Sequence, residues 1–273
     1  MSTGDHALAR ELATEAGRRL LELRARGGHP DVLRKGGDRL SHEFLSAQLA
    51  ARRPGDVLLS EEGADNPARL AASRVWIVDP LDGTREFGEP GRTDWAVHVA
   101  LWERDAPGEL TAAAVALPAQ GKVLSTLDPP PERRGTETAI TGTLPHRSGG
   151  RAAGGAAGGR VRIVVSRTRA PRLAREVAGR LDAELVPLGS AGAKVAAVVG
   201  GEADAYLHAG GFYEWDTAAP VAVARAAGLF AARIDGSALA YNQAELLMPD
   251  ILVCLPALAG ALLQAIGEVA GER

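Results

Sequence analysis

Several residue types that would indicate a particular environment are scarce in this chain of 273 residues. It has one cysteine, Cys254, which excludes an internal disulfide, and the apolar residues around it predict a small buried side chain. No apolar run reaches the roughly 18 residues that a membrane-spanning helix needs. The amino terminus lacks the basic start and apolar stretch of a signal peptide. These absences favour a protein of the reducing cytoplasm with no membrane partner.

The chain also lacks an excess of positive charge. Its 31 basic and 34 acidic residues give a net charge of −3, so we expect no binding to nucleic acid through overall charge. Lysine occurs only at Lys35, Lys122 and Lys194. An anionic substrate would therefore need local cations. The apolar fraction of 46% is ordinary for a globular protein and is enough for a sizeable core.

The hydrophobic pattern predicts a mixed α/β protein. Apolar residues recur with a helical period over residues 8–23 and again over 38–52, and the first helix is expected to end before Pro30. Short apolar runs predict strands over 57–59, 75–78, 95–101, 110–117, 122–127, 161–165, 184–187 and 205–207. Further helices are predicted over 172–181, 193–200, 216–227 and 258–269. Strands that alternate with helices indicate an α/β architecture.

A glycine-rich and alanine-rich segment divides the chain. Residues 145–160 contain three Gly-Gly pairs and no large apolar side chain; the apolar Leu144 lies just before this segment. Such a composition is typical of a flexible connector. We therefore expect an N-terminal half over residues 1–144 and a C-terminal half over 161–273.

The densest group of chemically active residues is Asp79-Pro80-Leu81-Asp82-Gly83-Thr84, directly after the apolar run 75–78. Proline is expected to end the strand, and the turn can direct both carboxylates and the Leu81 carbonyl at one point. Hard divalent cations prefer such oxygen ligands. Gly83 and Thr84 then offer backbone N–H groups to an anion. A polar turn in which an aspartate caps a helix is the alternative.

Two other segments carry acids at the ends of predicted elements. Glu61 follows Ser60 after a short strand, and Asp216 opens a helix whose next residues are small. Taken alone, Glu61 could be a solvated acid and Asp216 a helix cap. Together with the first motif, they could complete a metal site for phosphoryl transfer. The six histidines show no metal-ligand spacing, and His98 is predicted to be a buried core residue.

These segments resemble the inositol monophosphatase superfamily. The run Trp76 to Phe87 is similar to its long signature, and Trp215-Asp216-Thr217-Ala218-Ala219 is similar to its second motif, in the expected order. Glu61 takes the place of the family's upstream glutamate. The resemblance extends from Leu8 to about Leu255. It implies a layered αβαβα sandwich, with a metal cluster in the cleft between the two halves.

The resemblance also implies roles for individual residues. The ligands of two Mg²⁺ ions would be Glu61, Asp79, the Leu81 carbonyl, Asp82 and Asp216. Thr84, together with an upstream aspartate, would take a proton from the attacking water. Spacing to Glu61 identifies that aspartate as Asp38, for which a simple cap of the second predicted helix is the alternative.

One departure from the family pattern concerns the segment before Asp38. The family has a longer polar loop there, whereas this chain has only Lys35-Gly36-Gly37-Asp38. A third, weaker metal site formed by that loop is therefore left open.

Within the superfamily, Ser60-Glu61-Glu62 and the ending Arg85-Glu86-Phe87 most resemble the 3′(2′),5′-bisphosphate nucleotidases, which remove the 3′-phosphate of 3′-phosphoadenosine 5′-phosphate. This would also allow 3′-phosphoadenosine 5′-phosphosulfate as a substrate. The predicted substrate contacts are Gly83, Thr84, Arg85, Ser190, Lys194 and Asp216. For Arg85 and Lys194, an ordinary exposed position is the alternative.

Other functions stay open at this point. Inositol-1-phosphate, fructose-1,6-bisphosphate and histidinol phosphate are alternative esters for the same chemistry. A catalytically silent protein that binds a nucleotide or a metal is a second alternative. The resemblance also allows a homodimer.

Overall fold

The computed structural model describes residues 3–106, 110–129, 131 and 160–272. Apart from Arg160, the predicted connector 145–160 lies outside the described residues, so the boundary between the two halves stays a prediction.

The first part of the chain forms two long helices and a five-stranded sheet. The helices are α1 (Thr3–Ala25) and α2 (Pro30–Arg52). The strands are β1 (Val57–Ser60), β2 (Arg74–Asp82), β3 (Ala96–Glu103), β4 (Leu110–Leu117) and β5 (Lys122–Ser125). They lie in the order β1-β2-β3-β4-β5, with β1 parallel to β2 and the other pairs antiparallel. Short helical segments are η1 (Pro67–Leu70), α3 (Thr84–Gly88) and η2 (Pro118–Gln120).

The second part forms another five-stranded sheet with four helices. Its strands are β6 (Arg162–Ser166), β7 (Glu184–Leu188), β8 (Ala205–Tyr213), β9 (Phe230–Ala232) and β10 (Leu247–Cys254), in the order β7-β6-β8-β10-β9. The helices are α4 (Arg172–Arg180), α5 (Ala191–Gly200), α6 (Glu214–Ala226) and α7 (Pro256–Gly271). The sequence did not predict β9 and β10, although Cys254 is buried in β10 as expected.

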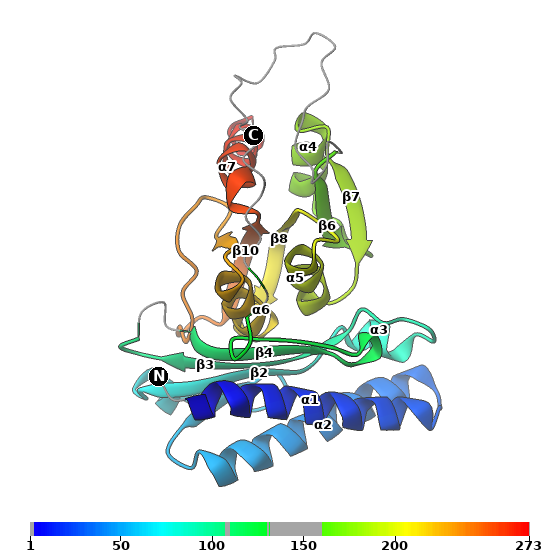
Figure 1. Cartoon of the computed structure of the whole chain (residues 1–273), viewed down its shortest axis with the longest axis vertical. Coiled ribbons are helices and arrows are strands. Elements are labelled where there is room, and N and C mark those ends of the chain that lie inside the picture. The colour runs from blue at the N-terminus through cyan, green and yellow to red at the C-terminus, as the bar shows by residue number, and fades with distance from the viewer. Residues whose placement is uncertain (1–2, 107–109, 130, 132–159, 273) are drawn as a thin grey trace.

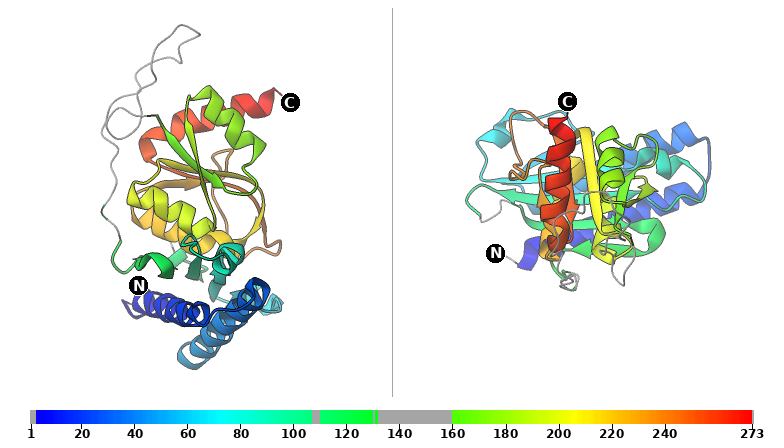
Figure 2. Two further views of the ribbon diagram at one scale, coloured as in Figure 1. Left: turned by 90° about the vertical axis from the view of Figure 1, so that its right-hand side faces the viewer. Right: turned by 90° about the horizontal axis from the view of Figure 1, so that it is seen from above.

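These elements stack in five layers, as Figure 1 shows from bottom to top and Figure 2 from the side: α1 and α2, the first sheet, α5 and α6, the second sheet, then α4 and α7. The predicted αβαβα sandwich is thereby confirmed. Successive side chains of β2 point to opposite faces of the first sheet, which explains the layering. Trp76 and Val78 belong to the core between this sheet and α1, whereas Val75 and Ile77 belong to the core shared with the second sheet. No helix in the described part of the chain is both long and apolar enough to cross a membrane.

Helix α2 begins eight residues earlier than predicted. Pro30 was expected to end the first helix, but it is also the first residue of the second helix. Its missing N–H costs nothing in the first turn, because that N–H would have no partner within the helix. Asp38 is therefore a mid-helix residue, and its interpretation as a helix cap is wrong. Gly37 allows α2 to lie close to β2 and α3, because a Cβ there would be 2.8 Å from the Leu81 Cδ2 and Phe87 Cε1 atoms.

Strand β2 also runs further than predicted. It passes through Pro80 to Asp82, and its register against β3 shifts between Asp79 and Asp82. A proline is tolerated in a sheet at such a bulge, where no ladder hydrogen bond needs its N–H. The expectation that the strand ends at Asp79-Pro80 is therefore wrong, and the bulge positions two acids at the carboxyl end of one strand.

Candidate active site

Asp79 and Asp82 are both buried where β2 meets the middle helical layer. Asp79 follows Val75 and Ile77 on the strand face that turns toward α6. The backbone after Asp82 turns at Gly83, whose φ of +85° favours glycine. A Cβ at Gly83 would lie 3.2 Å from the Asp94 carbonyl oxygen, which also favours glycine there. Helix α3 begins at the next residue, Thr84.

Glu61 reaches Asp79 because their strands are parallel neighbours. Ser60 pairs with Val78, which places the residues that follow them side by side. The Asp79 side chain acts on Glu61 through a hydrogen bond that partly lowers the pKa of Glu61. Crowding by protein atoms, followed by the Asp216 charge, raises the pKa of Glu61 to about 7, although the residue as a whole is exposed. Burial and the charges of its acidic neighbours raise the pKa of Asp79 well above its ordinary value.

Asp216 comes from the opposite side of the site, in the first turn of α6. Asp216 does not open the helix as predicted, because α6 begins at Glu214 with Tyr213 as the N-cap. Its Oδ2 atom nevertheless accepts a hydrogen bond from the Tyr213 N–H at 2.6 Å, which caps the helix from its third residue. Burial, followed by the Asp82 charge, raises the pKa of Asp216 to about 6. The capping bond uses one carboxylate oxygen and leaves the other for a ligand. The cap and metal-ligand interpretations are therefore compatible.

Asp82 is held by protein donors on one side. Its Oδ2 atom accepts hydrogen bonds from the Ser190 hydroxyl at 2.5 Å and from the Gly192 N–H at 2.7 Å. Burial by itself would raise the pKa of Asp82, but His98, Lys194 and Ser190 outweigh it and lower the pKa to about 2. Ser190 also accepts from the Ala193 N–H at 3.0 Å. With its hydroxyl engaged twice, Ser190 positions Asp82 and caps α5, and its substrate contact stays a prediction.

The two predicted basic contacts differ in their surroundings. Lys194 is buried, so the alternative of an exposed lysine is wrong. Its Nζ atom donates to the Gly189 carbonyl at 2.9 Å and lies 5.3 Å from the centre of the Tyr206 ring. Burial lowers the pKa of Lys194, while Asp82, Glu86 and other nearby acids raise it. Arg85, in contrast, is exposed on α3.

Asp38 and Thr84 lie together as predicted, although they come from different elements. The Thr84 hydroxyl is 3.2 Å from Asp38 Oδ1 and 3.0 Å from the Leu81 carbonyl oxygen. A hydroxyl has one proton, so it donates to only one of these acceptors at a time. Burial, followed by the Glu62 charge, raises the pKa of Asp38 to about 6, against the lowering effect of the Thr84 bond.

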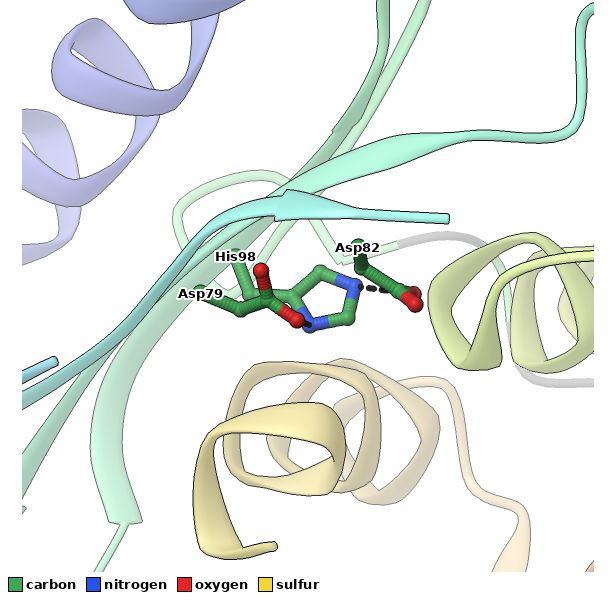
Figure 3. A group of neighbouring side chains, drawn as sticks. All are labelled: Asp79, Asp82 and His98. Carbon is green, nitrogen blue, oxygen red and sulfur yellow. Dashed lines mark ion pairs between the residues drawn. The ribbon is translucent and has the colours of Figure 1, made fainter. Parts of the chain in front are cut away.

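His98 is the residue of this site that the sequence did not predict. It is buried in β3 as expected, but its ring lies between Asp79 and Asp82 (Figure 3). The Nε2 atom is 3.1 Å from Asp82 Oδ2, and Nδ1 is 4.0 Å from Asp79 Oδ2. The β2–β3 pairing, in which His98 is opposite Asp79, is the signal that could have found it.

The donor set fits a hard divalent cation. Ligand atoms of Asp79, Asp82 and His98 all lie within 4.8 Å of one another. Glu61 and Asp216 add further carboxylates whose charges act on the same acids. Three of the four carboxyl groups have raised pKa values because protein atoms crowd them and because neighbouring acids repel their negative charge. Oxygen ligands with excess negative charge are the environment that Mg²⁺ requires.

This excess charge predicts how Mg²⁺ stabilises the protein at different pH values. A raised pKa means that the folded state loses stability as pH rises through it, about 6 for Asp216 and 7 for Glu61. A bound cation removes that penalty. We expect the Mg²⁺-induced rise in Tm to be several degrees larger at pH 8 than at pH 5.5. A Mg²⁺ concentration of 100 times Kd adds about 2.7 kcal/mol per site to the free energy of unfolding. Differential scanning fluorimetry with and without Mg²⁺ measures this, and an equal rise at both pH values would contradict it.

Comparison with known proteins shows the family of the chain and its fold. The model of the inositol monophosphatase family matches residues 7–269. A 3′-phosphoadenosine 5′-phosphate phosphatase from Mycobacterium leprae is 48% identical over 273 aligned residues, covering 97% of this chain and 94% of the relative. A protein of the same name from Mycobacterium bovis is 48% identical and covers 93% and 90%. The crystal structure of inositol monophosphatase II from Staphylococcus aureus superposes with a TM-score of 0.73 at 19% identity, covering 96% of this chain and 95% of that one.

The chain belongs to the inositol monophosphatase family. Members of this family are metal-dependent phosphatases, and the structure has a cluster around Asp79 and Asp82 that could hold a metal ion. The resemblance deduced from the two sequence motifs is thereby confirmed. The roles of the individual site residues stay predictions.

Proposed function

We propose that this protein is a Mg²⁺-dependent phosphatase that removes the 3′-phosphate of 3′-phosphoadenosine 5′-phosphate. The observation that carries the proposal is the 48% identity, over nearly the full length of both chains, to relatives that are named for this activity. The ending Arg85-Glu86-Phe87 after the metal motif points to the same substrate class.

The proposed reaction is direct hydrolysis. When bound, Mg²⁺ supplies a Lewis acid that makes water a better nucleophile and neutralises charge on the phosphate and on the leaving oxygen. Glu61, Asp79 and the Leu81 carbonyl would hold one ion, and Asp79, Asp82 and Asp216 a second. Thr84 and Asp38 would accept the proton of the attacking water. Backbone N–H groups of Gly83 and Thr84 would bind the phosphate.

The proposal includes two ions and not three. The family's longer loop before Asp38 has no counterpart here, because Lys35, Gly36, Gly37 and Asp38 all lie within helix α2. Backbone carbonyls inside a helix are already hydrogen-bonded and are poor metal ligands.

An aromatic pair beside the site, with Tyr213 exposed and Trp215 partly buried, supports a nucleotide substrate. The rings of Tyr213 and Trp215 are stacked, with centroids 4.8 Å apart and planes 16° apart. Tyr213 is 46% exposed, although it is only three residues from Asp216 and bonded to its carboxylate. Aromatic faces of this kind bind planar bases by stacking. An inositol ring has no planar face to stack there.

The substrate class is tested by phosphate release from purified protein with Mg²⁺, using 3′-phosphoadenosine 5′-phosphate and inositol-1-phosphate at equal low concentration and an EDTA control. We expect the nucleotide to be favoured by about a hundredfold in kcat/KM, which corresponds to about 2.7 kcal/mol. Equal or better hydrolysis of the inositol ester would refute the substrate and leave the metal-dependent chemistry. The absence of turnover on both, and on histidinol phosphate and fructose-1,6-bisphosphate, would favour a silent binding protein.

The proposal also covers the cellular compartment and the oligomeric state of the enzyme. We infer that it acts in the cytoplasm on a small phosphorylated substrate, since its relatives are named for a nucleotide substrate and the chain has a single buried cysteine. A homodimer is the assembly proposed from the family resemblance, and sedimentation velocity would test it.

A further inference from the structure

We propose that His98 is a positioning residue of the metal centre, which orients Asp82 and connects it to the first turn of α6. The inference rests on the proposed metal-dependent activity but not on the identity of the ester.

The geometry of the His98 ring supports this role. Its Nδ1 atom is 3.2 Å from the Trp215 carbonyl oxygen, directly before Asp216 in the chain. A carbonyl oxygen only accepts, so Nδ1 donates in this contact. On the other side, Nε2 is 3.1 Å from Asp82 Oδ2 but outside hydrogen-bond geometry. Because Nδ1 already donates, this contact is an electrostatic attraction only in the ring form that carries a proton on Nε2 as well. One ring thus contacts a carboxylate on β2 and the backbone of α6.

The same geometry argues against His98 as a metal ligand. Both ring nitrogens face protein atoms, one a carbonyl oxygen and the other a carboxylate oxygen. Asp82 Oδ2 in turn receives Ser190 and Gly192 in addition to His98. Three contacts on one oxygen leave Asp82 Oδ1 as the atom that can bind a cation. Groups that orient a ligand in this way tune metal affinity without touching the metal.

Helix α5 makes room for the ring. A Cβ at Gly192 would be 2.2 Å from His98 Nε2, so the first turn of α5 can approach only because this residue is glycine. An ordinary core residue is the competing explanation, since Ala96 and Ala100 beside His98 on this face of β3 are apolar. Simple packing, however, would not need polar contacts at both nitrogens.

Two variants separate the two contacts. An asparagine places its amide near the Nδ1 position, so His98→Asn keeps a donor for the Trp215 carbonyl and loses the reach to Asp82. A glutamine extends to the Nε2 position, so His98→Gln keeps the Asp82 contact. His6→Gln is the matched control, because His6 lies in the outer helix α1 and contacts Thr126 Oγ1 at 2.8 Å.

The measurement is the Kd of Mg²⁺ for the metal-free protein by isothermal titration calorimetry without substrate, together with Tm and with kcat and KM. We expect His98→Asn to weaken Mg²⁺ binding about tenfold and to lower kcat more than it raises KM. His98→Gln should restore most of the affinity, and His6→Gln should not change it.

Three outcomes would overturn the inference. They are an unchanged Mg²⁺ affinity in folded His98→Asn, a fall in Tm without a change in affinity, and equal losses in both His98 variants. Because the titration contains no ester, a wrong substrate assignment leaves this result intact. A wild-type protein that binds no Mg²⁺ would instead refute the proposed metal-dependent function, and this inference with it.

Discussion

Replacing Asp79 by asparagine should lower kcat/KM by about a thousandfold or more and, at the same time, raise the Tm of the metal-free protein. Asp79 lies among the other three acids, and burial and their charges raise its pKa. Removing its charge takes away a ligand that both proposed ions share. The loss corresponds to about 4 kcal/mol of transition-state stabilisation. The same change relieves repulsion in the absence of metal, so activity and stability move in opposite directions.

The fold should tolerate this substitution. Asp79 Oδ1 accepts a hydrogen bond from the Leu81 N–H at 3.0 Å, and an asparagine oxygen can accept it equally well. Asp204 provides a matched control, because it is also a buried aspartate that accepts a backbone N–H, from Arg162 at 2.9 Å. Asp204→Asn should lower Tm and leave kcat near that of the wild type. Near-normal turnover of the Asp79 variant would show that the metal site has been assigned wrongly.

Replacing Asp38 by asparagine should lower kcat by a factor of about 10² to 10⁴, the usual contribution of a general base. Burial and the Glu62 charge raise the pKa of Asp38 to about 6, so the basic form dominates only above that pH. The wild-type rate should therefore fall as pH decreases through about 6. The pH–rate profile of Asp38→Asn should lack the part of this decline that Asp38 causes.

Glu62 and Thr84 provide the controls for this prediction. Glu62→Gln removes a charge that raises the pKa of Asp38, so the decline should move to lower pH while kcat at pH 8 is retained. Thr84→Ser keeps the hydroxyl between Asp38 and the Leu81 carbonyl and should retain activity, whereas Thr84→Ala should lose it. An unchanged profile in Asp38→Asn would exclude Asp38 as the base.

Local pattern was enough to predict most of the fold. The continuous apolar run 75–78 and the helical period of residues 8–23 correspond to β2 and α1 because each depends on which face is buried. The prediction failed where a local rule had a tertiary exception. Pro80 lies at a bulge inside β2. Gly36-Gly37 lies inside α2, where the lack of a side chain at Gly37 permits close packing against Leu81.

The residues of the candidate site likewise include some that local sequence pattern predicts and some that it does not. Glu61, Asp79 and Asp216 were predicted because a family motif and the ends of elements mark them, and the structure brings their charges together. His98 carries no such mark, since a histidine in an apolar strand has the same pattern whether it packs in the core or contacts an acid. Only the β2–β3 register places it opposite Asp79. The burial of Lys194 likewise depends on how α5 meets β8, which no local pattern contains.

The continuous helix α2 makes the length of one segment as important as its composition. Asp38 is held by helical register, counted from Pro30, and not by a loop that could adjust. Inserting a single residue between Pro30 and Gly37 would rotate the part of α2 after the insertion by about 100° around the helix axis, relative to the part before it. The same insertion would shift the two parts by about 1.5 Å along the axis. Either Asp38 would then leave Thr84, or the start of the helix would lose its packing. Deletions and insertions in this stretch should therefore be as damaging as replacement of Asp38 itself.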